Sequence, residues 1–557
     1  MPALPLPEDP DFGQLRNQAR DLQRAVRAGD AAALALVTEF HPDPPAAAAF
    51  PLSAAQLVLA RKYGFPSWAR LRRYVQLSWT PGIPPPEHEP LPDRFLRLAC
   101  LTYSDDAASD RAAAARLLAE HPELPSLNLP VAAACADVAQ VRRFLATDPS
   151  LATAAGGPHG WSPLLYQAYA RHDPGIGRDA TLETARRLLA AGADPDDGRF
   201  WHGLPTPFTV LTGVFGAGER SQPWHPHQLP FARLLLTAGA DPNDGQALYN
   251  RMFGRNDDHL VLLFEFGLGR GSGGPWHRML GGALESPAEM LSNLLYWAVS
   301  HDQRDRVALL AANGVDVVHR FGHLRGGRTR RTPVEEALLH GHRELAGQLL
   351  ALGARPPRLR GVDAFVAAVM AGDAVAVEAA SPALLAAVRK ARPGLLPWVV
   401  SLGYQNILEL LLQAGYDVNS YGRSDGPFDD PWHTALHVAA GDGNVSMAQQ
   451  LLGLGADAGL RDKRYDSTPL GWARHFGHQE LIDLLEPVTP EGGLHGSFPV
   501  RRTNRPRGSG SLRGWSAPGS LRGCPPRVAQ GACGAAGPLN GPAAAARQGA
   551  RGPRAPS

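Results

Sequence analysis

The sequence Thr434-Ala-Leu-His-Val-Ala-Ala440 recurs, with changes, as Thr468-Pro-Leu-Gly-Trp-Ala473. The two threonines are 34 positions apart, and Ala439 and Ala473 have the same separation. A fixed period of about 20 to 50 residues is typical of proteins built from stacked units, none of which can bury its apolar face alone. We therefore expect an all-α solenoid of helix pairs rather than one globular core.

A second motif marks the end of a unit and also recurs. Its clearest copy is Leu451-Leu-Gly-Leu-Gly455-Ala-Asp457. The upstream copies contain Gly192-Ala-Asp194, Gly239-Ala-Asp241, Gly314-Val-Asp316, Gly353-Ala354 and Gly415-Tyr-Asp417. With weaker units near residues 92–124, 125–158, 244–270 and 360–390, the pattern predicts about eleven repeats over residues 91–487.

These motifs resemble the ankyrin repeat, which has a period of about 33 residues and the signature Thr-Pro-Leu-His-x-Ala, Gly-His-x-Glu and Leu-Leu-x-x-Gly-Ala-Asp. The resemblance implies helix-turn-helix units joined by finger loops, with His437 hydrogen-bonded in the turn between repeats. Thr434 and Thr468 are placed to cap a first helix, and Pro469 suits the first helical position. Gly455 is expected to end a second helix in the left-handed conformation.

The spacing between repeats is irregular. From Gly192 to Gly239 the step is 47 residues, and from Gly239 to Gly314 it is 75 residues. Both steps exceed multiples of the period, so loops have been inserted between helices. Insertions in repeat proteins commonly project from one face, which is often the face that binds.

Residues 1–80 are interpreted as a separate helical segment, followed by a Pro-rich linker at residues 81–90. Residues 14–37 predict one helix pair and residues 52–74 a second, and this segment resembles the N-terminal segment of a family of bacterial ankyrin-repeat proteins. We expect it to cap the array, since the ends of solenoids need a polar outer face. An alternative is a DNA-reading helix-turn-helix that uses the basic side chains Arg61, Lys62, Arg70, Arg72 and Arg73.

Residues 488–557 contain ten arginines, no lysine and one acidic residue, Glu491. They are rich in Gly, Pro and Ala and show no periodicity, so they cannot bury enough apolar surface to offset chain entropy. The sequence predicts a disordered tail, or else the product of a shifted reading frame. Its charge of +9 leaves 2 − 9 = −7 for residues 1–487, which disfavours a nucleic-acid groove in the solenoid.

The composition favours a cytoplasmic protein. Four cysteines, at positions 100, 135, 524 and 533, are too few and too scattered to staple 557 residues. The N-terminus has prolines and acids where a secretion signal needs a basic start and an apolar stretch. The apolar runs are too short to span a membrane. We expect a soluble and monomeric chain.

The dipeptide Trp-His occurs four times, as Trp201-His202, Trp224-His225, Trp276-His277 and Trp432-His433. Three copies lie in or beside the stretched segments, and the fourth precedes Thr434. Tryptophan contributes strongly to binding energy at interfaces, so all eight residues are candidates for binding a partner. The alternative interpretation is that each indole anchors its own long loop to the helices.

Other residue patterns give weaker signals. His225-Pro-His227 and His340-Gly-His342 have a spacing that could serve a metal, but no cysteine or carboxylate set joins them at ligand spacing. The glycine-rich stretch 267–274 lacks the Lys-Ser/Thr of a phosphate-binding loop. No catalytic motif is present. We therefore predict no metal, no cofactor and no enzymatic activity.

The sequence as a whole predicts a scaffold or adaptor that binds an unidentified protein through a concave face and finger loops. The alternative is a regulator associated with DNA or RNA through residues 52–76 and the basic tail. A repeat fold does not specify its target.

Overall fold

The computed structural model describes most of the chain between residues 12 and 490. The described residues are 12–63, 65, 67–77, 88–104, 106–201, 206–218, 222–321, 323–324, 327–328, 331–422 and 431–490. The predictions for His202, for most of the linker and for residues 491–557 of the tail lie outside these residues.

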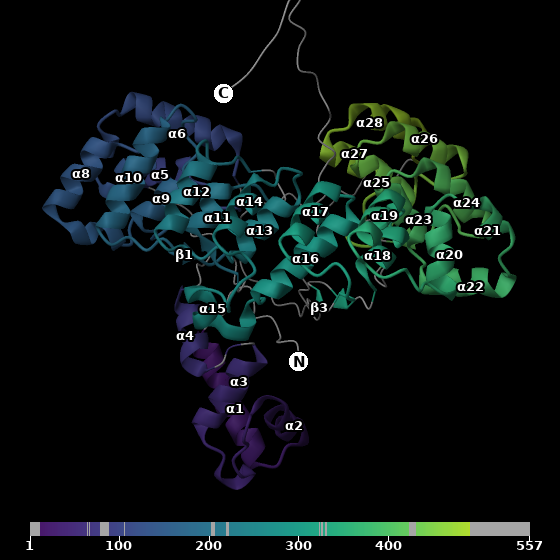
Figure 1. Ribbon diagram of the computed structural model, residues 1–557, viewed down its shortest axis with the longest axis horizontal. Coiled ribbons are helices and arrows are strands. Elements are labelled where there is room, and N and C mark those ends of the chain that lie inside the picture. Colours follow the sequence, from purple (N-terminus) through teal and green to yellow (C-terminus); the bar gives the residue numbers. More distant parts are fainter. Residues whose placement is uncertain are drawn as a thin grey trace, which may run out of the picture.

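The described part of the array contains eleven helix pairs. Figure 1 shows how these helices are arranged along the array. The first helices of the pairs are α5 (Leu91–Ala99), α7 (Leu129–Ala134), α9 (Pro163–Tyr169), α11 (Val210–Phe215), α13 (Gly245–Met252), α16 (Pro287–Ser300), α18 (Pro333–Leu339), α20 (Gly361–Met370), α23 (Leu395–Ser401), α25 (Ala435–Gly441) and α27 (Pro469–Phe476). The second helices are α6 (Ala108–Glu120), α8 (Val138–Thr147), α10 (Arg178–Ala190), α12 (Gln228–Thr237), α14 (Asp258–Glu265), α17 (Arg304–Ala312), α19 (Arg343–Ala351), α21 (Ala374–Glu378), α24 (Leu408–Gln413), α26 (Val445–Gly453) and α28 (Gln479–Leu485). Two further helices are α15 (Pro275–Leu280) and α22 (Pro382–Ala391).

The first helices stack on one another and form the centre of the array. Contacts run from α5 through α7, α9, α11, α13, α16 and α18 to α20, and again from α23 through α25 to α27. In α9 all seven residues are buried, whereas in α8 only Val141 is buried. Buried alanines such as Ala439 and Ala440 let neighbouring helices approach closely. The second helices therefore supply one apolar face each and leave the other to solvent.

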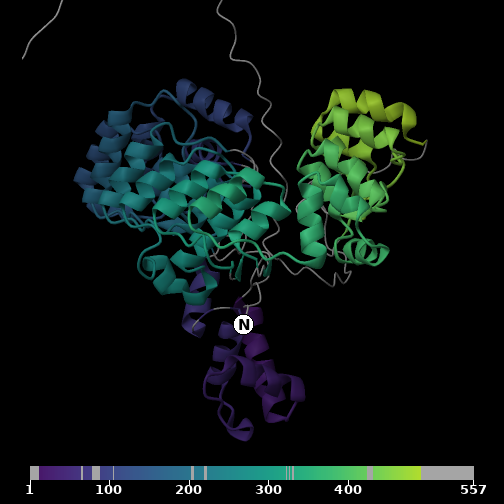
Figure 2. The ribbon, with the colours of Figure 1, turned by 45° about the vertical axis from the view of Figure 1, so that its right-hand side comes forward.

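The array has two lobes with separate hydrophobic cores. One core runs from Phe95 to Ala354 and the other from Leu339 to Leu485. Figure 2 shows the two lobes from another side, with α18 to α28 in green on the right. The contacts of α18 with both α16 and α20 join them.

Three antiparallel hairpins form fingers between repeats. They pair β1 (Gly198–Arg199) with β2 (Phe208–Thr209), β3 (His323–Leu324) with β4 (Gly327–Arg328), and β5 (Tyr421–Gly422) with β6 (His433–Thr434). The first hairpin leads directly into α11, and the third leads directly into α25.

The same turn geometry recurs after several of the second helices. Gly192, Gly239 and Gly455 have φ values of +99°, +105° and +91°, in the left-handed region that glycine adopts without strain. Two residues later, an aspartate accepts a hydrogen bond from the backbone N–H of residue i+2. These bonds measure 2.9 Å at Asp194, 3.0 Å at Asp241 and 2.7 Å at Asp457. Each glycine thus ends a helix, and each aspartate fixes the turn that follows it.

His437 joins the last two repeats from a buried position. Its Nδ1 lies 2.8 Å from the Thr434 hydroxyl oxygen, and its Nε2 lies 2.9 Å from the carbonyl oxygen of Ser467 in the next repeat. Because a carbonyl only accepts, Nε2 carries the proton. The hydroxyl of Thr468 in turn accepts from the N–H of Gly471 at 3.3 Å and caps α27, which Pro469 begins.

The N-terminal segment contains the two expected helix pairs. These are α1 (Phe12–Arg27) with α2 (Ala31–Phe40), and α3 (Leu52–Lys62) with α4 (Trp68–Leu77). The expectation that this segment caps the end of the array is wrong in its placement, because α4 packs on α15 in the middle of the first lobe. Burial of apolar side chains explains this placement. Leu15 and Leu71 share a small buried cluster with Phe200 and Leu280, and these two residues are contributed by inserted segments.

Replacing Leu280 by asparagine should release the N-terminal segment from the array. Leu280 is fully buried in a cluster of only a few residues, and a buried amide without partners costs about 1–3 kcal/mol. Small-angle scattering should show a larger radius of gyration, and limited proteolysis should show faster cleavage after α4. Val261→Asn, at an exposed position on α14, is the control. An unchanged radius together with an unchanged cleavage pattern would refute the docking role of Leu280.

The His437 contacts predict a loss of stability at acidic pH. Burial lowers the pKa of His437 to about 4, whereas a histidine of the unfolded chain titrates near about 6.5. The unfolded chain therefore binds more protons below about pH 6.5, and stability falls as the pH drops from there toward about 4. Burial also lowers the pKa of His172 and of His301 to about 4, so several groups add to this slope.

His437→Gln should lower the free energy of unfolding at neutral pH by about 1–3 kcal/mol, because it disturbs two buried hydrogen bonds. It should also reduce the loss between pH 6 and 5 by up to about 1.4 kcal/mol. Urea denaturation at a series of pH values measures both effects, with His475→Gln at an exposed position as the control. An identical pH slope in the H437Q variant would contradict the assignment.

Candidate functional site

Trp201 follows β1 and lies half-buried against the first lobe. Its indole N–H donates to the hydroxyl of Ser104 at 3.2 Å, and its ring centroid lies 6.1 Å from that of Phe208. The side chain thus fastens the finger to the segment after α5. Its neighbour His202 is outside the described residues.

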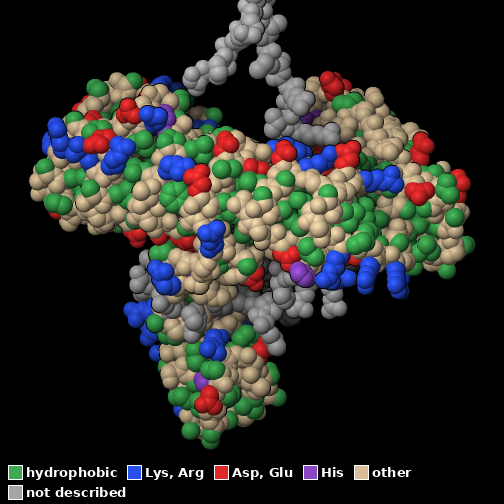
Figure 3. All heavy atoms as spheres, viewed as in Figure 1, with side chains coloured by type: hydrophobic (Ala, Val, Ile, Leu, Met, Phe, Trp, Pro, Cys, Tyr) green, Lys and Arg blue, Asp and Glu red, His purple; other side chains and the backbone are tan. Residues whose placement is uncertain are grey.

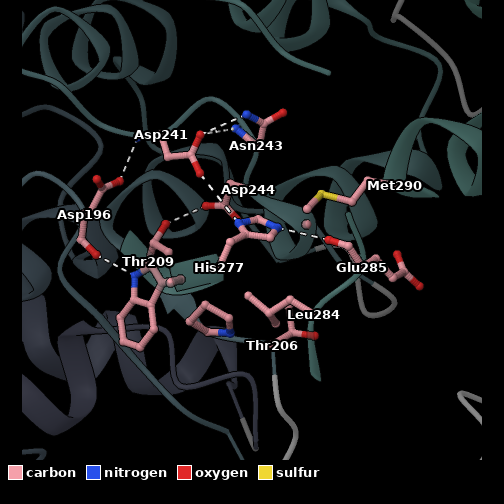
Figure 4. Close-up of a pocket in the computed structure, with 13 residues that line it drawn as sticks. Asp196, Thr206, Thr209, Asp241, Asn243, Asp244, His277, Leu284, Glu285 and Met290 are labelled. Carbon is pink, nitrogen blue, oxygen red and sulfur yellow. Dashed lines mark hydrogen bonds and ion pairs between the residues drawn. The ribbon is translucent and has the colours of Figure 1, made fainter. Parts of the chain in front are cut away.

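Trp276 and His277 lie in α15 and fasten an insertion to the first finger and to the turn after α12. The indole N–H of Trp276 donates to the Asp196 carbonyl at 2.7 Å, and the Phe200 ring lies edge-on at 5.4 Å. His277 Nε2 lies 3.0 Å from the Glu285 carbonyl oxygen, and Nδ1 lies 3.8 Å from an Asp241 carboxylate oxygen. Figure 4 shows these side chains around one pocket.

The pocket is acidic, and its carboxylates already have backbone partners. Asp241 accepts from the N–H groups of Asn243 and Gly274, and Asp196 accepts from the N–H of Asp241 at 2.7 Å. Burial raises the pKa of Asp196 to about 6. Asp244, whose pKa burial also raises, accepts from the hydroxyls of two threonines and caps α13. The carboxylates of Asp196, Asp241 and Asp244 are therefore occupied by protein donors, and the pocket serves to hold the α15 insertion in place.

Trp432 and His433 lie in the second lobe, at the finger before α25. The Trp432 ring lies 5.3 Å from Trp472 and 5.7 Å from Tyr465, and the Arg464 guanidinium lies 4.4 Å above it. His433 is fully buried. This pair belongs to the packing between the last two repeats.

Trp224 differs from the other three tryptophans because it is 44% exposed. It lies in the inserted loop between α11 and α12, with the Arg251 guanidinium 4.1 Å from its ring centroid. The next residue, His225, is buried, and its Nδ1 accepts from the N–H of His227 at 3.1 Å. An indole that is exposed and also fixed in place is a suitable anchor for a partner.

A buried arginine holds the Trp224 loop. Arg171 donates from Nε to the Pro223 carbonyl at 2.9 Å and from Nη2 to the Gly213 carbonyl at 2.6 Å. The loop also turns at Gly216, which has φ +61°. No local sequence pattern predicts this contact, because Arg171 and Pro223 are 52 positions apart.

The structure does not bring the four Trp-His pairs into one surface. Trp201 and Trp276 both lie beside the first finger, Trp224 lies on the next insertion, and Trp432 lies in the other lobe. The exposed arginines Arg355, Arg358 and Arg360 between α19 and α20 were not predicted as candidate site residues. Their spacing around two prolines was the available signal.

The histidine pairs considered for metal binding have protein partners. His227 Nε2 lies 2.7 Å from the Ile176 carbonyl, His340 Nδ1 lies 2.9 Å from the Glu336 carbonyl, and His342 Nε2 lies 3.0 Å from the Ser300 carbonyl. In the described part of the chain, no three His, Cys, Asp or Glu side chains are grouped as metal ligands would be. Among the helices of the described residues, none has the length and apolar character needed to cross a membrane.

Comparison with known proteins identifies ankyrin repeats in the second lobe. Residues 396–489 match the family model for ankyrin repeats (3 copies), which corresponds to α23 through α28. A segment of 89 residues is 38% identical to the Arabidopsis thaliana potassium channel GORK and covers 16% of this chain and 10% of the channel. A segment of 99 residues is 31% identical to putative glutaminase 3 of Caenorhabditis elegans and covers 18% of this chain and 16% of that protein. The chain thus spans less than a fifth of either relative. The resemblance to bacterial proteins stays a prediction.

The different environments of Trp224 and Trp276 predict different effects of alanine substitution. Trp224→Ala should lower the free energy of unfolding by about 1–2 kcal/mol, since it removes a partly exposed indole that covers the buried guanidinium of Arg251. Trp276→Ala should cost about 2–4 kcal/mol, because it removes an indole that is packed on Phe200 and bonded to Asp196. Urea denaturation monitored by circular dichroism measures both. Equal losses in the free energy of unfolding would contradict the assignment of Trp224 to the surface and of Trp276 to the contacts that hold the α15 insertion.

Proposed function

We propose that residues 91–487 form one ankyrin-repeat array that binds a protein partner through its concave face and fingers, as a scaffold or adaptor. The proposal includes no catalytic role, no cofactor, a cytoplasmic location and a monomeric chain. The observation that carries it is the match of residues 396–489 to ankyrin repeats, a module that in general mediates contacts between proteins.

The recurring turn geometry supports extending the ankyrin assignment to the first lobe. Left-handed glycines followed by aspartate turns occur at Gly192, Gly239 and Gly314, outside the matched region, and at Gly415 and Gly455 within it. The helix pairs also stack in the same order on both sides of α18. A common architecture for all the repeats is the simplest account of these repeated local structures.

Trp224 is the part of the array that we assign to the partner. It is exposed, rigidly held by the Arg171 contacts to its loop, and located on an insertion. Large amphipathic side chains at such positions often contribute about 2 kcal/mol or more to binding. The other Trp-His pairs have a structural role in this proposal.

The nucleic-acid alternative has less support from the geometry. The second helix of the basic pair, α4, packs on α15, so the array limits its access to a DNA groove. In addition, the Arg72 guanidinium lies 5.9 Å from the Phe12 ring centroid within the segment itself.

The test is affinity capture from native cell lysate with the full chain, followed by mass spectrometry. A protein that binds the array through Trp224 should be captured at least about tenfold less by the Trp224→Ala variant. Val261→Ala, at a similarly exposed position on α14, is the matched control and should capture normally.

Two outcomes would contradict the proposal. One is the absence of any protein captured in a Trp224-dependent manner. The other is an eluate dominated by nucleic acid whose retention on heparin is lost in an Arg61→Gln, Lys62→Gln and Arg72→Gln variant, which would support the alternative.

A further inference from the structure

Residues 354–360 connect α19 to α20 as an extended segment on the surface. Arg355, Arg358 and Arg360 are all exposed, and among the described residues no ion pair of their guanidinium groups occurs. Pro356 and Pro357 fix two consecutive φ angles and also restrict the residue before them to extended conformations. The arginines are therefore presented by a stiff backbone.

Glu335 ties this segment to the preceding finger. One of its carboxylate oxygens accepts the backbone N–H of Arg358 at 3.1 Å, and the other lies 3.8 Å from the guanidinium of Arg320. The Glu335 side chain is only 5% exposed, whereas that of Arg320 is 56% exposed. A buried carboxylate thus holds a fourth arginine beside the other three. We call Arg320, Arg355, Arg358 and Arg360 the basic finger surface.

The acidic groups near this surface are either buried or already paired. Glu336 is buried and lies 3.5 Å from Arg331. Asp363, in the first turn of α20, binds Arg331 at 3.0 Å and Arg392 at 3.0 Å. Figure 3 shows basic side chains in a row along the lower edge of the right-hand lobe, in the region of α18 to α20. Among the described residues, Arg355, Arg358 and Arg360 therefore carry positive charge that no carboxylate pairs with, whereas Arg320 is paired with Glu335.

We propose that the basic finger surface binds an acidic, extended segment of a partner protein, with carboxylates paired to guanidinium groups. This inference rests on the proposed function and adds the chemistry of the partner. Planar guanidinium groups bind carboxylates through two parallel hydrogen bonds. A backbone that is already stiff loses little entropy on binding. Residues 1–487 carry 2 − 9 = −7, so a long duplex lying on this surface would meet repulsion beyond it.

Arginine footprinting of the full chain with phenylglyoxal tests this site, because mass spectrometry reads each arginine separately. The probe is a glutamate-rich peptide at about twice its Kd, where about two thirds of the sites are filled. Modification of Arg355, Arg358 and Arg360 should then slow about threefold. The exposed Arg116 and Arg142 of the first lobe are matched controls and should react at an unchanged rate. A glutamine-rich peptide of the same length should protect none of them.

The variant Arg355→Gln, Arg358→Gln and Arg360→Gln keeps the backbone bond to Glu335 and should abolish protection of Arg320. Equal protection by the glutamine-rich peptide, or no protection by the acidic one, overturns the proposal. So does stronger protection by duplex DNA at equal charge concentration, which would assign the surface to nucleic acid. If the acidic peptide leaves no footprint but a protein is still captured in a Trp224-dependent manner, the acidic-segment proposal alone is overturned. If no protein is captured in a Trp224-dependent manner, the proposed function is overturned.

Discussion

The structure depends on the burial of each helix pair by its neighbours. A single pair such as α25 and α26 cannot bury its own apolar face. Stacking against the neighbouring pairs removes that face from water. The first helices are accordingly more deeply buried than the second helices, as α9 and α8 show, and alanines at positions such as Ala439 keep the first helices close. Hydrogen bonds across the junction, such as that from His437 to the Ser467 carbonyl, then fix how one repeat sits on the next. This stacking determines where the surface features of the array lie.

Because each repeat contacts mainly its neighbours, the array can accept insertions at the turns without losing its core. The insertions are nevertheless firmly held. Asp241 and Trp276 fasten the α15 insertion to the turn after α12 and to the first finger, and Arg171 fastens the loop that carries Trp224. The fastened α15 insertion then offers Leu280 to the N-terminal helices. An insertion has thus become the attachment point for a separate segment.

The features that the sequence predicts well are those decided within a few residues. The left-handed glycine and the aspartate turn at Gly455 and Asp457 form a local structure, so the residues of the turn are enough to predict it. The docking of residues 12–77 depends on contacts between Leu71, Phe200 and Leu280, which no local pattern contains. The Trp-His pairs show the same limit. Identical dipeptides are exposed at Trp224 and packed at Trp432, because the neighbouring helices decide the environment.

Net charge is a poor guide to the surface of such an array. Residues 1–487 are acidic overall, but many of their carboxylates accept hydrogen bonds in turns and helix caps. Asp194 and Asp457 accept hydrogen bonds in the turns after α10 and α26, and Asp244 caps a helix. Arg199 of the first finger is buried, but Arg355, Arg358 and Arg360 after α19 stay exposed. The repeated turns therefore engage aspartates in hydrogen bonds while exposed arginines leave a basic surface between α19 and α20. Glu335 shows both effects in one residue by serving as a helix cap and as the support of Arg320 and Arg358.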